Sequence, residues 1–129
     1  MSEKILTMKL LENTFCVVRL DKDAIIPKWI NKDSFYSITR TDDEFSIVCL
    51  QDSVPLDIKI EKDWKILKIV GVLDFSLIGI LASISTLLAA NKISIFVIST
   101  YDTDYILVKN DKIEATIKIL GENNYEIIT

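Results

Sequence analysis

The second half of the chain combines apolar runs with a segment of helical periodicity. Residues 64–72 form an apolar, strand-like run. A turn follows, and a helix is then predicted up to about residue 90, because its apolar positions fall on one face. That face consists of Ile80, Leu81, Ile84, Leu87 and Leu88. We expect Asp74 or Ser76 to cap the start of this helix, and Asn91 to end it.

The remaining pattern predicts three more strands and one more helix. Asp111 and Glu114 have the spacing of a capping box, and Gly121 is typical of a helix end. Ile113, Ile117 and Leu120 supply the apolar stripe between them. The predicted ranges are strands at 93–99, 105–109 and 125–128, and a helix at 111–120.

The order from residue 64 onward is therefore strand, helix, strand, strand, helix, strand. Two βαβ crossovers around a central hairpin give a four-stranded antiparallel sheet with both helices on one face. This pattern predicts an α+β fold of the ferredoxin-like βαββαβ class.

The first half has the same order with shorter elements. A strand or an extended leader is predicted at 5–12, a strand at 15–20, and a β-hairpin at 34–39 and 45–50. Pro27 suits the first turn of a brief helix over 23–31, and the alternation over 56–61 suits a short edge strand. We therefore expect two modules, an abbreviated one at 1–62 and a complete one at 63–129.

Composition excludes several kinds of function. The chain has 129 residues, a net charge of −4 and no histidine, so catalytic triads built on histidine are ruled out. The acidic balance disfavours nucleic acids and anionic membranes as partners. Cys16 and Cys49 lie in apolar runs, which favours buried, reduced thiols in a cytoplasmic protein and leaves a disulfide as the alternative.

Membrane, metal and cofactor sites are not expected. Residues 75–91 carry no charge, but serines and a threonine interrupt them, which favours a buried helix over a membrane span. The amino terminus lacks the pattern of a signal peptide. The aspartate pairs 42/43 and 102/104 lie in turns without a third ligand, so we predict neither a metal site nor a catalytic carboxylate pair.

The first candidate for chemistry is the segment 71–79, which joins a strand to a helix. Gly71 allows a tight turn, and Gly79 allows close approach to the first helical turn. A helix start offers unpaired N–H groups that suit a carboxylate. The alternative is that both glycines serve only the turn and the packing of the helix on the sheet.

The second candidate is the run 99–104, in which six consecutive residues carry a hydroxyl or a carboxylate. Asp102 and Asp104 are suited to an ammonium or guanidinium group. The alternative is a solvated hairpin loop. In the predicted topology the two candidates lie on neighbouring parts of the sheet, so together they would suit an α-amino acid.

These residues resemble the small stand-alone ACT-domain proteins of bacteria. The resemblance rests on 71–79 with 93–108, and on 35–49, and it covers about residues 9–128. The run 99–105 is also similar to one in the ACT modules of the eukaryotic cytosolic arginine sensor, and aspartate kinase regulatory modules are more distant relatives. The resemblance implies two ACT-like modules, the first abbreviated.

The resemblance also implies a non-catalytic regulatory protein. ACT modules pair side by side and bind small molecules, mostly amino acids, between modules, so a homodimer and an unidentified regulated partner protein are expected. The implied ligand-binding residues are Gly71, Val72, Leu73, Asp74, Phe75, Ser76, Gly79, Ser99, Thr100, Tyr101, Asp102, Thr103 and Asp104. The alternative is a structural oligomerisation module that binds no small molecule.

Overall fold

The chain forms two compact units in the computed structural model, which describes residues 6–70 and 79–129. Unit 1 consists of Met1–Glu12 and Lys65–Thr129, and unit 2 consists of Asn13–Trp64. Each unit has its own hydrophobic core. The strand β5 (Ile60–Ile69) supplies its first residues to unit 2 and its last residues to unit 1.

Unit 1 has the predicted order of elements from β5 onward, and the expectation of a ferredoxin-like α+β fold is confirmed. Its elements after β5 are α1 (Ile80–Ala90), β6 (Ile95–Ser99), β7 (Asp104–Lys109), a 3-10 turn η3 (Asn110–Lys112), α2 (Ile113–Glu122) and β8 (Tyr125–Ile128).

The sheet of unit 1 contains one strand more than predicted. The strand β1 (Leu6–Leu10) lies between β5 and β8, antiparallel to the former and parallel to the latter. On the other side of β5 follow β7 and β6. We expected residues 1–62 to form one module, and this is corrected: β1 belongs to the sheet of unit 1.

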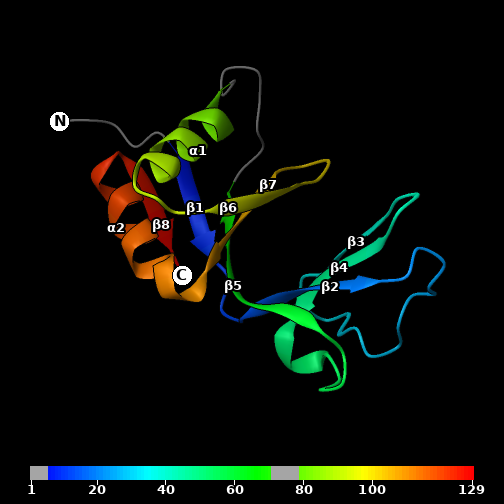
Figure 1. Ribbon diagram of the computed structural model, residues 1–129. Helices are drawn as coiled ribbons and strands as arrows, with labels where there is room; N and C mark the ends of the chain where they lie inside the picture. The colour runs from blue at the N-terminus through cyan, green and yellow to red at the C-terminus, as the bar shows by residue number, and fades with distance from the viewer. Residues whose placement is uncertain (1–5, 71–78) are drawn as a thin grey trace. The chain divides into compact units, whose positions relative to one another are not determined.

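One face of this sheet is covered by both helices. Ile84 and Leu88 of α1 pack in the same core as Ile113 and Leu120 of α2, and Met8 of β1 is fully buried there. Figure 1 shows α1 and α2 on the same side of β1 and β8. The predicted stripes on both helices are confirmed, because period 3.6 places these residues on one face.

The predicted helix ends are only partly right. Asn91 ends α1 and donates its side-chain N–H to Leu87 O at 2.9 Å, as expected of a cap. The capping box is wrong: Lys112 is the N-cap of α2 and makes no side-chain cap bond. Gly121 lies inside α2, and Asn123 ends it with a 2.7 Å bond to Ile119 O. The Asn123 side chain thus satisfies the carbonyl of Ile119. In a helix that ends at a glycine, backbone N–H groups satisfy such carbonyls instead.

Unit 2 is a small sheet with the strand order β3–β4–β2–β5. Its strands besides β5 are β2 (Phe15–Leu20), β3 (Ser37–Arg40) and β4 (Phe45–Leu50), and a 3-10 turn η1 (Gln51–Ser53) follows. The predicted hairpin of β3 and β4 is confirmed. The separate edge strand over 56–61 is wrong, because β5 begins only at Ile60 and Leu56 is fully exposed.

The predicted helix over 23–31 is also wrong, because this segment consists of turns and irregular backbone. Trp29 and Ile30 nevertheless pack on the core of unit 2, as expected. Arg40 holds the segment in place, since its guanidinium donates to the carbonyls of Lys22 and Ala24. The same guanidinium lies over the Phe45 ring, 4.3 Å from its centroid.

We predict that Arg40→Ala lowers the free energy of unfolding by about 1–2 kcal/mol, because two charge-assisted hydrogen bonds and a cation–π contact are lost. Urea unfolding measures the loss, and hydrogen exchange should show faster exchange over residues 21–36. Arg40→Lys keeps the charge but not the forked donor, so its free energy of unfolding should lie between those of wild type and Arg40→Ala. Equal stability of all three proteins would contradict this role.

Candidate functional site

The run 99–104 closes the hairpin of β6 and β7. The two strands pair in register from Ile95 with Val108 to Ser99 with Asp104. Thr100 and Thr103 then close the turn: Thr100 N donates to Thr103 O at 2.8 Å, and Thr103 N donates to Thr100 Oγ1 at 3.3 Å. We call residues 100–103 the hairpin turn.

Thr103 ties the hairpin turn to the end of β5. Its side chain is 5% exposed, and its hydroxyl donates to Ile69 O at 2.8 Å. Ile69 is the last residue of β5, two positions before the segment 71–79 that the sequence marks as a ligand site. Thr103 therefore fixes the hairpin turn to the strand that leads into that segment.

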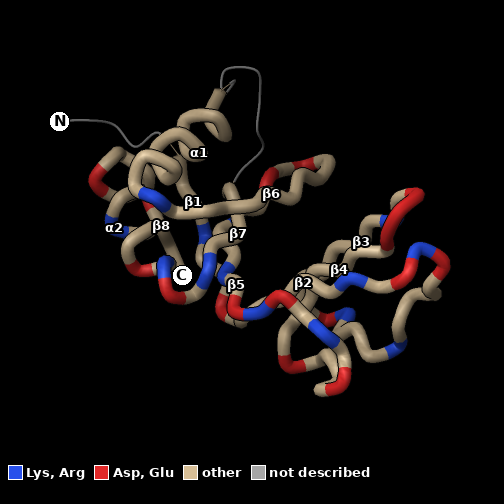
Figure 2. The backbone as a smooth tube through the Cα atoms, viewed as in Figure 1, with Lys and Arg blue, Asp and Glu red and all other residues tan. Residues whose placement is uncertain are grey.

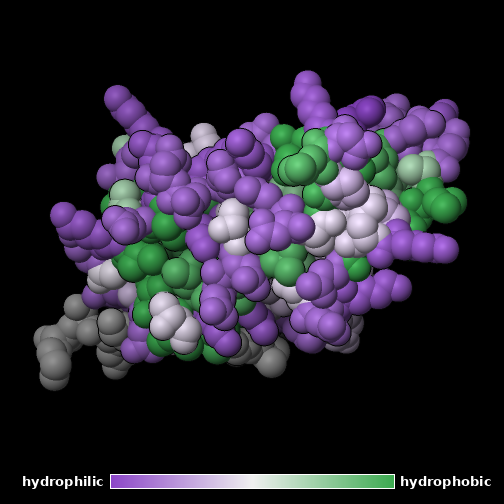
Figure 3. Space-filling model, turned by 90° about the horizontal axis from the view of Figure 1, so that it is seen from below, coloured by the Kyte–Doolittle hydropathy of each residue, from purple (hydrophilic) through white to green (hydrophobic). Residues whose placement is uncertain are grey.

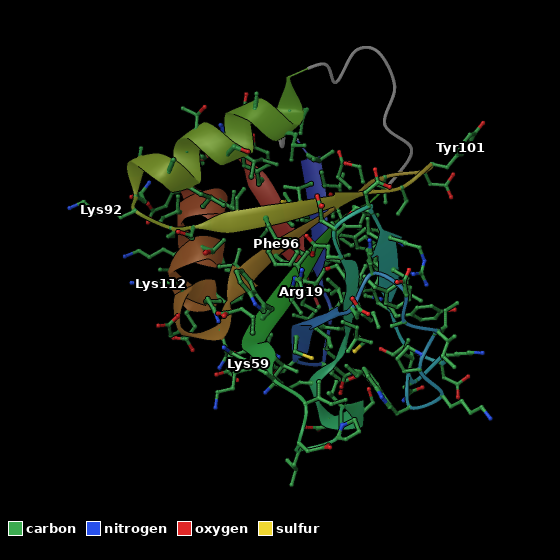
Figure 4. All side chains as sticks on the ribbon, turned by 45° about the vertical axis from the view of Figure 1, so that its right-hand side comes forward. Arg19, Lys59, Lys92, Phe96, Tyr101 and Lys112 are labelled. Atoms are coloured by element: carbon green, nitrogen blue, oxygen red, sulfur yellow. The ribbon has the colours of Figure 1, made fainter. Side chains whose placement is uncertain are left out.

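Tyr101 and Asp102 project from the hairpin turn. Both are exposed, and Tyr101 is fully so (Figure 4). Asp104 is partly buried at the start of β7. Figure 2 shows acidic residues and no basic ones along the outer part of this hairpin. The run thus separates into threonines that build the turn, an exposed aspartate at 102 and a partly buried one at 104.

Gly79 is the N-cap of α1 and has a φ of 88°, in the left-handed region. Glycine adopts this conformation without strain. A Cβ built on Gly79 would meet no atom of the described residues within 4 Å, so none of them fills the space beside it. Among the described residues no side chain caps the start of α1, and its first turn has no acidic residue.

Six of the expected ligand-binding residues lie outside the described part of the chain. They are Gly71, Val72, Leu73, Asp74, Phe75 and Ser76. The structure therefore describes the hairpin side of the expected site and the start of α1, but not the segment between β5 and α1.

Two depressions elsewhere were not predicted. One, of about 600 Å³, is lined in unit 1 by α1, Asn123 and Tyr125. The other, of about 440 Å³, lies in unit 2 and is lined by Arg19, Glu44, Ser46, Lys59 and Glu61, with Val17 and Ile60. Arg19 and Lys59 are labelled in Figure 4. Arg19 and Ser46, polar residues in the otherwise apolar strands β2 and β4, were the available indication of this second depression.

The first depression has a mostly apolar lining. On the side of α1 it is formed by Ala82, Ser83, Thr86, Leu87 and Ala90, none of which is charged. Burial of the Tyr125 side chain raises the pKa of its phenol above the ordinary value. Figure 3 shows a face of the molecule where hydrophobic side chains reach the surface between hydrophilic ones.

Metal binding and membrane insertion find no support in the described residues. In 6–70 and 79–129, no three or more Asp, Glu or Cys side chains are grouped so that they could hold a metal ion. No helix within those ranges has the length and hydrophobicity needed to cross a membrane.

Comparison with known proteins identifies the family. A family model described as an ACT domain matches residues 59–122, and a model described as an N-terminal domain matches residues 13–57. A solved protein from Agobacterium tumefaciens is 37% identical, covers 95% of this chain and 92% of its own, and superposes with a TM-score of 0.90. The chain belongs to the ACT-domain family. ACT domains are regulatory, non-catalytic modules, so this is a regulatory ACT-type protein.

More distant structures share the fold of this ACT protein. A Vibrio cholerae protein is 18% identical over 91% of this chain and 88% of its own, with a TM-score of 0.73. The aspartate kinase of Clostridium acetobutylicum is 15% identical over 89% of this chain and 33% of its own, with a TM-score of 0.65. A search of curated proteins found no match.

We predict that Thr103→Val destabilises the ACT protein by about 1–2 kcal/mol, because the bond to Ile69 O is lost while the shape is kept. Chemical unfolding measures the change. Thr86→Val, at an exposed position of α1, is the matched control and should stay within about 0.5 kcal/mol of wild type. If both variants lose the same stability, the hydroxyl of Thr103 has no special role.

Tyr125 predicts a loss of stability at alkaline pH. Because its pKa is raised in the folded protein, the unfolded chain loses this proton first as the pH rises. The free energy of unfolding should therefore be unaffected by Tyr125 below about pH 10 and fall above it. Urea unfolding between pH 8 and about 11 tests this, and Tyr125→Phe should show a smaller fall than wild type. Parallel curves for the two proteins would refute the prediction.

Proposed function

We propose that the protein is a non-catalytic cytoplasmic regulator that binds a free amino acid beside the β6–β7 hairpin. The observation that carries the proposal is the construction of the hairpin turn. Thr100 and Thr103 hold its shape, and Thr103 anchors it to Ile69 O. Asp102 is thereby presented to solvent from a fixed backbone, with Asp104 close by in the sequence.

The chemistry of the two parts is complementary to a zwitterion. Asp102 and Asp104 offer carboxylates to an ammonium group, and hydrogen bonds between such charged groups are stronger than neutral ones. The start of α1, which no described side chain caps, offers backbone N–H groups to a carboxylate, where the helix dipole favours negative charge. Residues 71–76 connect β5 to α1 and complete the proposed site.

A regulatory role follows if the ligand prefers one of two conformations or assembly states. A ligand shifts such an equilibrium only by its difference in affinity between the states. We propose a homodimer as the responding assembly and an unidentified partner protein as its target. The Clostridium acetobutylicum aspartate kinase, whose fold is similar, is described as an allosteric enzyme, which agrees with this role.

A thermal-shift screen against the twenty amino acids tests the proposal. A ligand at a hundred times its dissociation constant should add about 2.7 kcal/mol, which raises the Tm by several degrees. Asp102→Asn and Asp104→Asn should each weaken the best ligand by roughly 10–100-fold in calorimetric titration, because a charged hydrogen-bond partner is lost.

The matched control is Asp111→Asn, which removes an exposed aspartate of η3 beyond the other end of β7. This variant should keep wild-type affinity. If the two hairpin variants also bind like wild type, the ligand does not use this hairpin.

A second candidate function is an assembly module that binds no small molecule. It is favoured by α1, whose eleven residues carry no charge although five of them are exposed. Helices of this kind are usually covered. Light scattering and the thermal-shift screen, with and without the amino-acid panel, separate the two candidate functions. An oligomer whose mass and Tm do not change with any amino acid supports the assembly module.

A further inference from the structure

The two cysteines of the chain face each other across neighbouring strands. Cys16 of β2 is the direct partner of Cys49 of β4 in an antiparallel ladder. Both are reduced and fully buried in the core of unit 2. They are 33 positions apart in the sequence, so only the register of β2 and β4 brings them together.

This register suits a covalent bond between the two sulfur atoms. Residues directly opposite each other in antiparallel strands have Cα atoms about 4.5–5.5 Å apart. Disulfides span Cα separations of about 4.4–6.8 Å. The strands therefore need no rearrangement for Cys16 and Cys49 to become linked.

We propose that Cys16 and Cys49 form a redox-active pair, which small hydroperoxides oxidise reversibly to a disulfide across β2 and β4. The Cys49 thiolate attacks the outer peroxide oxygen, the O–O bond breaks, and an alcohol or water leaves with Cys49 as a sulfenic acid. The Cys16 thiol then attacks the Cys49 sulfur, the S–S bond forms, and water leaves. The two thiols lose two electrons and two protons in total, and a dithiol reductant returns them by exchange.

The surroundings favour Cys49 as the attacking sulfur. A hydrogen bond from the Cys16 thiol, aided by one from Ser53, lowers the pKa of Cys49 below its ordinary value against the effect of burial. The same pairing and burial raise the pKa of Cys16. The thiolate is the nucleophilic form, so the pair has a defined order of reaction.

Access to the pair is controlled by the segment that covers it. Ala24, Trp29 and Ile30 pack on the core that contains both cysteines. Arg40 holds this segment through the carbonyls of Lys22 and Ala24. Opening of the segment, rather than the chemistry of the thiols, should therefore set the rate of oxidation in the folded protein.

The test follows the thiols of the purified full chain, reduced and then freed of reductant, during treatment with hydrogen peroxide. Alkylation under denaturing conditions and intact mass count the thiols, and non-reducing peptide mapping locates the link. We expect both thiols to disappear together, with the loss of two hydrogen atoms and a peptide joining Cys16 to Cys49. Dithiothreitol should restore both, and the oxidised protein should have a Tm several degrees above the reduced one.

Three variants sharpen the test. Cys16→Ser and Cys49→Ser each leave one thiol, so peroxide should add oxygen or link two chains, without the rise in Tm. Arg40→Ala should oxidise severalfold faster than wild type and give the same disulfide.

Two results would overturn the proposal. One is a wild-type product that carries added oxygen or joins two chains in place of the internal link. The other is the survival of both thiols under peroxide concentrations that oxidise the urea-denatured chain. Both concern the wild-type protein, so the test does not depend on the folding of any variant.

Discussion

The packing of unit 1 depends on a strand that comes from the far end of the chain. β1 lies between β5 and β8, and Met8 pairs with Ile69 on one side and Ile127 on the other. The fully buried Met8 side chain joins the core under α1 and α2. The apolar face of the sheet is thus continuous only because residues 6–10 complete it, and β5, which carries the hairpin turn through Ile69 O, is held on that side by this strand.

Local periodicity explains which parts of the fold could be predicted. Stripes at period 3.6 identified the buried faces of α1 and α2, and apolar runs identified β2, β4 and β8 with their observed bounds. The place of β1 was not accessible in this way, because the strand's partners lie some 60 and 120 positions away along the chain. The helix expected over 23–31 failed for a related reason: Arg40, a residue outside the segment, donates to the carbonyls of Lys22 and Ala24 at its start.

The candidate site shows the same limit at the level of side chains. In the sequence, Ser99–Asp104 is one run of hydroxyls and carboxylates, and each of them is equally suited to bind a ligand. The structure divides this run by burial and hydrogen bonding. The buried Thr103 donates its hydroxyl to Ile69 O, while Asp102 faces solvent. Residue type alone cannot make that division, because a threonine hydroxyl serves a turn and a ligand equally well.

In both units a side-chain donor from one element satisfies backbone carbonyls of another. In unit 1 the donor is the Thr103 hydroxyl on Ile69 O, and in unit 2 it is the Arg40 guanidinium on Lys22 and Ala24. A buried carbonyl without a partner is costly, and local opening of a segment that loses such bonds takes less free energy than global unfolding. Changes at these contacts can therefore alter the exposure of the proposed ligand site or of the cysteine pair while both cores stay intact.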